Sequence, residues 1–98
     1  MEITSKQRSV LKGIAMTESA AFRIGKGGLT DEFIAAIAEY LEKNEIVKIH
    51  VLKNNDDDKK ELANALAEAT GSVPVQIIGS NIVLFKYQHD PKKRKIDI

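Results

Sequence analysis

Three glycines within four residues, in Gly25-Lys26-Gly27-Gly28, mark the segment whose residue types are best suited to chemistry. A backbone without Cβ atoms approaches a bulky anion closely, and the N–H groups at the start of a following helix attract negative charge. Lys26 adds a cation to the same loop. The segment therefore predicts a phosphate-binding loop, and a tight strand-to-helix turn without a ligand is the alternative.

The spacing of the glycines narrows the choice of anion. The chain contains no G-x-x-x-x-G-K-[ST] string, which excludes the mononucleotide P-loop. The dinucleotide fingerprint G-x-G-x-x-G fails at its last position, which is Thr30, and 98 residues leave no room for the second half of a dinucleotide fold. Gly25 and Gly28 do have the G-x-x-G spacing of loops that clamp the backbone of single-stranded nucleic acid.

Other cations are candidates for contact with the same polyanion. One lies in the short strand before the glycine loop, facing away from its neighbours, and three belong to the first helix. A C-terminal run, residues 91–95, holds four cations with no acid between them, for which a flexible solubilising tail is the alternative. These candidates are Arg23, Lys6, Arg8, Lys12, Lys92, Lys93, Arg94 and Lys95.

The distribution of charge points to a polyanion, although the net charge does not. Fifteen Lys and Arg against 14 Asp and Glu give a net charge of +1. Residues 1–30 carry five cations against two acids, as do residues 71–98, whereas residues 31–47 carry one cation against five acids. If the fold brings the two basic segments to one side, the protein has a basic face and an acidic back; ordinary surface scatter is the alternative.

Catalysis and metal binding find little support. His50 and His89 lack the spacing of a Ser/His/Asp triad or a His-x-x-x-His pair. The run Asp56-Asp57-Asp58 lacks the glycine and terminal glutamate of an EF-hand, so it fits a loop and a helix cap. The absence of cysteine excludes disulfides and thiolate zinc sites. We expect no enzyme activity, no metal and no cofactor.

Local patterns predict the elements that position these residues. Capping residues Thr4, Thr30 and Asp58 each open a helix, and Gly71 ends the third one. Strands are predicted at residues 22–24, 46–52, 73–78 and 82–87, with a hairpin turn at 79–81 and Pro74 indicating a strand start or edge. The order α-β-α-β-α-β-β predicts a single small α/β domain with a four-stranded mixed sheet, covering residues 1–89, followed by a basic tail at 90–98.

Helical spacing also predicts which faces pack. The first helix is expected to bury Val10, Leu11 and Ile14, with Arg8 and Lys12 pointing to the opposite side. For the third helix the predicted apolar stripe is Leu62, Ala65, Leu66 and Ala69. The second helix is expected to pack through its apolar residues and to expose an acidic face made of Asp31, Glu32, Glu39, Glu42 and Glu45.

Composition indicates the general class of protein. With 43% apolar and 30% charged residues the sequence is typical of a globular domain rather than a disordered segment. The sequence has no apolar run approaching a membrane span, and residues 1–4 lack a signal-peptide pattern. We therefore expect a cytoplasmic protein without a membrane partner, and a monomer by default.

Several motifs in order resemble one family over nearly the whole chain. The N-terminal motifs are Thr4-Ser5-Lys6-Gln7-Arg8, Leu11-Lys12-Gly13 and Ile24-Gly25-Lys26-Gly27-Gly28-Leu29-Thr30. The later motifs are Glu61-Leu62-Ala63, Ala69-Thr70-Gly71 and Gln76-Ile77-Ile78-Gly79. With these motifs the sequence resembles the bacterial YhbY family, the stand-alone CRM domain, whose members bind RNA.

The resemblance implies a fold similar to the C-terminal domain of bacterial translation initiation factor three. It implies RNA contact through the G-x-x-G loop and association with precursors of the large ribosomal subunit. Gly27 departs from the family pattern, which often has a polar side chain such as asparagine there. We therefore expect a non-catalytic protein that binds ribosomal RNA. The alternatives are an adaptor that docks a ribosomal protein or assembly factor, and a phosphate-handling enzyme, for which the sequence nominates no general base.

Overall fold

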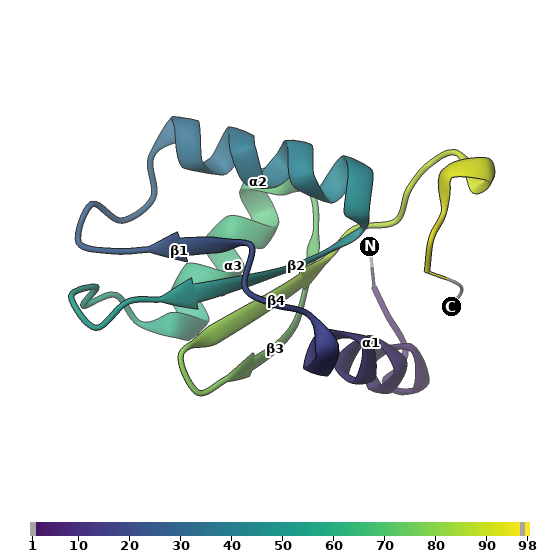
Figure 1. Cartoon of the computed structure of the whole chain (residues 1–98), viewed down its shortest axis with the longest axis horizontal. Coiled ribbons are helices and arrows are strands. Elements are labelled where there is room, and N and C mark those ends of the chain that lie inside the picture. The colour runs from purple at the N-terminus through teal and green to yellow at the C-terminus, as the bar shows by residue number, and fades with distance from the viewer. Residues whose placement is uncertain (1, 97) are drawn as a thin grey trace.

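A computed structural model describes residues 2–96 and 98 (Figure 1). The order of elements confirms the predicted α-β-α-β-α-β-β arrangement, to which the structure adds a short 3-10 helix, η1. In chain order the elements are α1 (Ser5–Thr17), β1 (Phe22–Ile24), α2 (Asp31–Asn44), β2 (Ile46–Val51), α3 (Lys59–Thr70), β3 (Val73–Ile78), β4 (Asn81–Phe85) and η1 (Pro91–Lys93). Among the described helices, none has the length and apolar character needed to cross a membrane.

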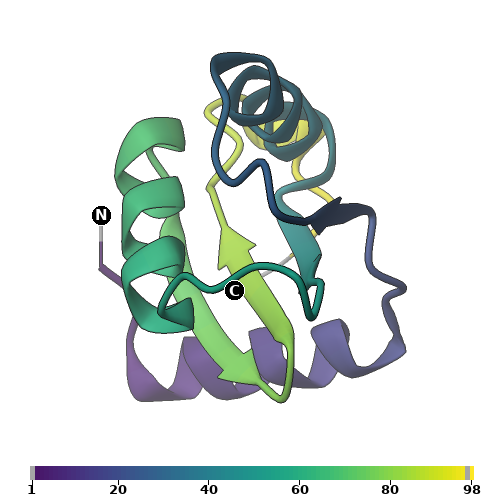
Figure 2. The ribbon, with the colours of Figure 1, turned by 90° about the vertical axis from the view of Figure 1, so that its left-hand side faces the viewer.

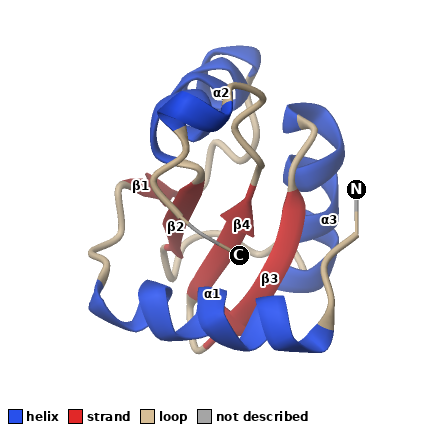
Figure 3. Cartoon of the chain, turned by 90° about the vertical axis from the view of Figure 1, so that its right-hand side faces the viewer, coloured by secondary structure: helices blue, strands red, loops and turns tan. Residues whose placement is uncertain are grey.

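The four strands form one mixed sheet between helical layers. Their order is β1-β2-β4-β3, with β1 and β2 parallel and β4 antiparallel to both of its neighbours. The helices α2 and α3 cover one face of the sheet, and α1 crosses the other face (Figures 1 and 3). Pro74 lies in β3, an edge strand, as predicted, because a residue without an N–H is tolerated at an edge.

The predicted caps start the helices. Thr4 and Gln7 form a reciprocal capping box, in which the Gln7 N–H donates to Thr4 Oγ1 at 3.1 Å and the Thr4 N–H donates to Gln7 Oε1 at 2.9 Å. The hydroxyl of Thr30 accepts from the backbone N–H of Phe33, and the carboxylate of Asp58 accepts from two N–H groups in the first turn of α3. Gly71 ends α3 in the left-handed conformation, with φ 68°.

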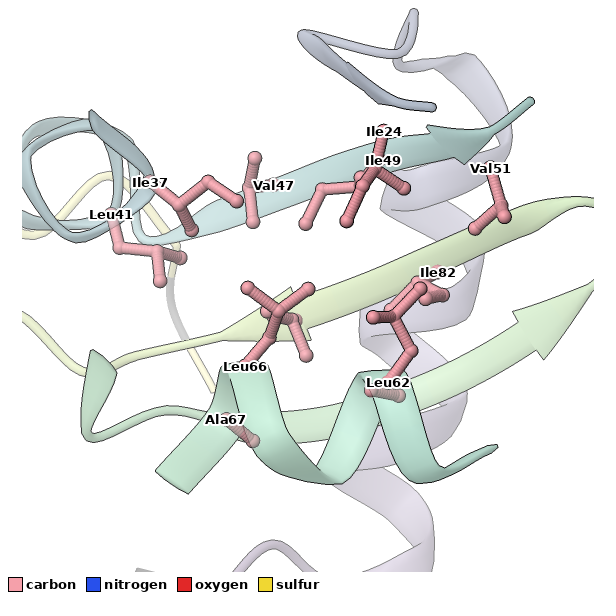
Figure 4. Close-up of a cluster of buried hydrophobic side chains, with 12 residues drawn as sticks. Ile24, Ile37, Leu41, Val47, Ile49, Val51, Leu62, Leu66, Ala67 and Ile82 are labelled. Carbon is pink, nitrogen blue, oxygen red and sulfur yellow. The ribbon is translucent and has the colours of Figure 1, made fainter. Parts of the chain in front are cut away.

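Apolar side chains form a separate core on each face of the sheet. Between the sheet and the α2/α3 layer lies the cluster drawn in Figure 4, which includes Val47, Ile49 and Val51 of β2. On the opposite face, α1 packs against the sheet through a second cluster. This second cluster comprises Leu11, Ala15, Ile46, Val75, Val83, Phe85 and Ile96.

The packed face of α1 differs from the prediction. Leu11 and Ala15 are buried, whereas Val10 is 43% exposed. Arg8 shares the packed face because positions 8, 11 and 15 follow the i, i+3, i+7 spacing of one helical face. Its guanidinium Nη1 donates to the carbonyl of Pro74 at 2.9 Å, so the predicted orientation of Arg8 away from the core is wrong.

Helix α3 also packs through a face shifted from the predicted one. Ala65 and Ala69 are exposed, and Ala63, Ala67 and Thr70 are buried instead, beside Leu62 and Leu66, which are buried as predicted. Alanine carries little information about burial because its side chain is as compatible with a surface as with a core.

Glu45 does not belong to the exposed acidic face. The residue is 1% exposed and ends α2 with φ 67°, a positive value that is uncommon for residues other than glycine, at the turn into β2. Its carbonyl accepts from the N–H of Lys86 at 2.7 Å, at the point where β4 ends after Phe85. The turn thus directs the carboxylate of Glu45 inward. Strand β4 ends at Phe85, two residues before the predicted end at residue 87.

Candidate nucleic-acid interface

The glycine segment forms a tight turn between β1 and α2. The N–H of Gly28 donates to the carbonyl of Gly25 at 3.1 Å, which leaves Lys26 and Gly27 at the tip. Gly28 has φ 64°, and a Cβ on Gly25 would lie 3.2 Å from the Asn54 side chain. Gly27 has open space around it. Gly28 therefore allows the backbone to turn, Gly25 leaves room for the Asn54 side chain, and Gly27 leaves Lys26 as the one side chain at the tip.

A second loop, residues 52–58, holds the glycine turn through hydrogen bonds. The side-chain amide of Asn55 donates to the carbonyl of Gly25 at 2.8 Å, and its oxygen accepts from the N–H of Asp57 at 2.9 Å. Leu52 adds a backbone hydrogen bond to Ile24 at 2.9 Å. No local pattern in the sequence indicates this role of Asn55, because its partner is 30 residues away.

Cations and acids lie on different sides of the glycine turn. Arg23 and Lys26 are exposed on the side of β1 and the tip. Asp31 and Glu32 occupy the first turn of α2, and the carboxylate of Asp57 would lie 3.7 Å from a Cβ on Gly28. An anion is therefore attracted at the tip and the β1 side, and repelled at the α2 end of the turn.

The cations of α1 have different environments. Lys6 and Lys12 are exposed. Arg8 is half-buried and donates to carbonyl oxygens of Pro74 and Val75, beside the bulge of β3. The guanidinium therefore supplies hydrogen-bond donors to two carbonyls of the edge strand β3. Only its remaining N–H groups are available to a ligand.

The basic tail lies at the opposite end of the molecule from the glycine turn. Figure 1 shows the two at the two ends of the long axis, and Figure 2 shows the turn in front and the tail behind. The longest extent of the molecule is 38 Å. A single basic face formed by residues 1–30 and the tail is therefore not observed, because β1 carries the glycine turn away from the C-terminal end.

The tail is docked on the domain. The carboxylate of Glu45 accepts from the N–H groups of Lys95 and Ile96, and Ile96 is buried in the second core. Arg94 lies over the ring of Tyr87, 5.4 Å from its centroid. Residues 90–96 are therefore not a flexible tail. The division of the chain into an RNA-binding domain, residues 1–89, and a basic tail, residues 90–98, stays a prediction.

The docked tail forms one wall of a basic cleft. Its volume is about 760 Å³, and the end of α2 forms the other wall. Among the described residues, one acid, Glu42, lines the cleft, and the Nζ of Lys86 lies 2.6 Å from its carboxylate. This hydrogen bond and the charge of Lys86 lower the pKa of Glu42. The cations lining the cleft are Lys43, Lys92, Lys93, Arg94 and Lys95.

Comparison with known proteins covers nearly the whole chain. The model of the CRS1 / YhbY (CRM) domain family matches residues 3–86. "Probable RNA-binding protein YqeI" of Bacillus subtilis is 41% identical over 91 residues, which are 93% of this chain and 95% of that protein. An "RNA-binding protein" of Haemophilus influenzae is 30% identical over 92% of this chain and 91% of its own length. The solution structure of protein SAV1595 from Staphylococcus aureus matches with a TM-score of 0.80 and 44% identity, covering 98% of this chain and 100% of that one.

Proposed function

Because the chain belongs to the CRS1 / YhbY (CRM) domain family, we propose that it is a non-catalytic RNA-binding protein. Its proposed target is ribosomal RNA in precursors of the large subunit, in the cytoplasm. Relatives named RNA-binding proteins support the partner. The ribosomal target rests on the resemblance to the YhbY family.

The glycine turn is the observation that carries this proposal. The turn from Gly25 to Gly28 leaves its tip without a bulky side chain except that of Lys26, and Asn55 holds its backbone in place. A phosphate approaching the tip meets backbone at close range and the cations of Lys26 and Arg23 beside it. These features suit the sugar-phosphate backbone of a single strand, which G-x-x-G loops clamp over about four nucleotides.

The tail cleft is proposed as a second electrostatic contact. Its cations are exposed and lie on a docked backbone, so they have a defined position relative to the glycine turn. An RNA that uses both contacts must run along the long axis of the molecule. An oligonucleotide of about four nucleotides fits the turn alone. Comparing short and long RNA therefore separates the two contacts.

Salt-dependent binding tests the glycine turn. Each lost phosphate contact reduces the slope of log K against log salt by about 0.7 on single strands. We expect Lys26→Ala and Arg23→Ala each to weaken binding of a short RNA across sequences and to flatten this slope by that amount. Lys60→Ala, on the exposed surface of α3, is the matched control and should leave both unchanged. An affinity that responds to neither variant nor to salt would overturn the assignment of RNA binding to the turn.

Crosslinking in cells followed by sequencing of the bound RNA tests the ribosomal target. Enrichment of precursor ribosomal RNA is expected, and enrichment confined to messenger or transfer RNA would contradict the target. Nuclease treatment of a pulldown addresses the adaptor alternative, since an adaptor keeps its protein partners without RNA and an RNA-binding protein releases them.

A further inference from the structure

On the sheet face opposite α2 and α3, no helix of the described residues covers the part nearer the glycine turn. The α1 helix crosses this face at the end nearer the chain termini (Figures 1 and 3). Its last turn lies beside Lys48, whose Nζ donates to the carbonyls of Ala15 and Glu18, both at 3.3 Å. The chain then leaves α1, and the N–H of Ala21 donates to the carbonyl of Lys48 at 2.9 Å. The part of the sheet that lies beyond Lys48, toward the glycine turn, remains open on this face.

A row of four side chains crosses this open part. Arg23 of β1 is paired with His50 of β2, His50 with Asn81 of β4, and Asn81 with Ile78 of β3. Residues paired directly across strands project from the same face. The neighbours of the row in sequence, among them Ile49 and Val51, point into the opposite core. All four strands therefore contribute to the row.

The row combines a cation, two hydrogen-bonding side chains and an exposed aliphatic side chain. Arg23 is an exposed cation and Ile78 is 52% exposed, an unusual position for a large aliphatic side chain. His50 and Asn81 are half-buried between them. The Nδ1 of His50 lies 3.2 Å from Oδ1 of Asn81, which orients the imidazole and leaves the Nδ2 of the amide as a donor. The four side chains include no carboxylate.

We propose that this row, Arg23-His50-Asn81-Ile78, binds a nucleotide of the single-stranded RNA that enters at the glycine turn. Arg23 is two residues before Gly25, so the row continues the proposed phosphate contact onto the sheet. The phosphate is bound by Arg23, the base stacks on His50 and Ile78, and Asn81 hydrogen-bonds to the base edge. Histidine is among the side chains on which RNA bases stack, and amides bond their edges. This inference rests on the proposed function and adds to it a site that contacts a base.

Binding of short single-stranded oligonucleotides to the full chain tests the row. Base stacking is worth about fivefold in affinity or more, so His50→Ala should weaken binding by at least that factor. His50→Gln keeps a hydrogen-bonding group toward Asn81 and lacks the imidazole ring, and we expect the same loss. Asn81→Ala should reduce the differences in affinity among the four homopolymers without changing the salt slope, because it removes no charge. Asn64→Ala, exposed on α3, is the control and should have no effect.

Two further measurements separate this inference from the proposed function. An abasic oligonucleotide retains the phosphates, so its affinity should respond to Lys26→Ala and not to His50→Gln. In the wild-type protein, the side-chain NMR signals of His50 and Asn81 should shift when a short RNA with bases is added and stay in place with the abasic one. If these signals do not move while Lys26→Ala still weakens binding, the row is wrong and RNA binding at the turn stands. If the wild-type protein binds no RNA, both proposals fail.

Discussion

The two basic ends of the molecule are built in different ways. At the glycine-turn end, Arg23 and Lys26 are exposed cations beside a backbone turn that the hydrogen bond from Gly28 to Gly25 closes. At the tail end, the cations belong to a segment held by the buried carboxylate of Glu45 and by Ile96 in the second core. Lys and Arg supply positive charge at both ends, but different interactions fix the backbone that carries these side chains.

Charge and stability therefore depend on different groups in this protein. The cations at either end are exposed, and substitutions of exposed side chains usually change the free energy of unfolding by less than about 0.5 kcal/mol. At the turn, stability depends on the backbone conformation of Gly28. At the tail, it depends on the burial of Ile96 and on the buried carboxylate of Glu45, which accepts hydrogen bonds from the tail. Substitutions at those groups should therefore change stability, whereas substitutions of the cations should change RNA binding.

The largest effect on stability is expected at the tail. Ile96 is 9% exposed, and its replacement by alanine removes methyl groups from the core shared with α1. We expect Ile96→Ala to lower the free energy of unfolding by about 2 kcal/mol, which for a domain of this size lowers the Tm by roughly 10 °C. Thermal and urea melts measure the change. The control is the double variant Lys92→Ala/Lys93→Ala, for which we expect an unchanged Tm; a Tm of Ile96→Ala equal to wild type would show that the tail is not anchored.

An intermediate effect is expected at the glycine turn. Gly28 has φ 64°, where a side chain is strained, and Gly27 has open space and no positive φ. Gly28→Ala should therefore lower the free energy of unfolding by about 1 kcal/mol, and Gly27→Ala should leave it nearly unchanged. Urea melts of the two variants compare two glycines that are adjacent in the chain. Equal destabilisation by both would mean that the conformation of the turn is not what requires glycine.

The smallest effect is expected from the pH dependence of the tail end. Lys86 lowers the pKa of Glu42 through a hydrogen bond and through its charge. A carboxyl whose pKa is lower in the folded state adds stability above the ordinary glutamate pKa and loses it as the pH falls through the folded value. Glu42→Gln should therefore reduce the loss of stability in acid, by a small amount because the pair is partly exposed. Melts across the acidic range measure this, and an acid profile identical to wild type would contradict the role of the pair.

Features that depend on residues a few positions apart were predicted well. The capping box at Thr4, the caps at Thr30 and Asp58, the glycine turn, the packing of the apolar residues of α2 and the alternation of β2 are all local patterns, and the structure confirms them. Each requires only the helical or extended geometry of its own segment. The order of elements follows from these patterns.

Features that depend on distant partners were predicted poorly. Arg8 was expected to point to solvent, but its partners are carbonyls of β3 more than 60 residues away. Glu45 was expected on the acidic face, but its positive φ and its hydrogen bonds to residues 95 and 96 bury it. In both cases the amino-acid type suggested solvent, because a charged side chain is buried only where the fold supplies hydrogen-bond partners.

The elements, the mixed α/β class, the glycine turn and the family of this protein follow from its sequence, because helical and strand periodicity, caps and motifs depend on neighbouring residues. The positions of the basic segments follow from the fold, because strand order and helix packing bring distant residues together. It separates the tail from the glycine turn by most of the length of the molecule (Figure 1). It also aligns His50 and Asn81, 31 residues apart, beside Arg23. Charge composition is a sum over the chain, whereas a binding surface depends on which residues the fold places side by side.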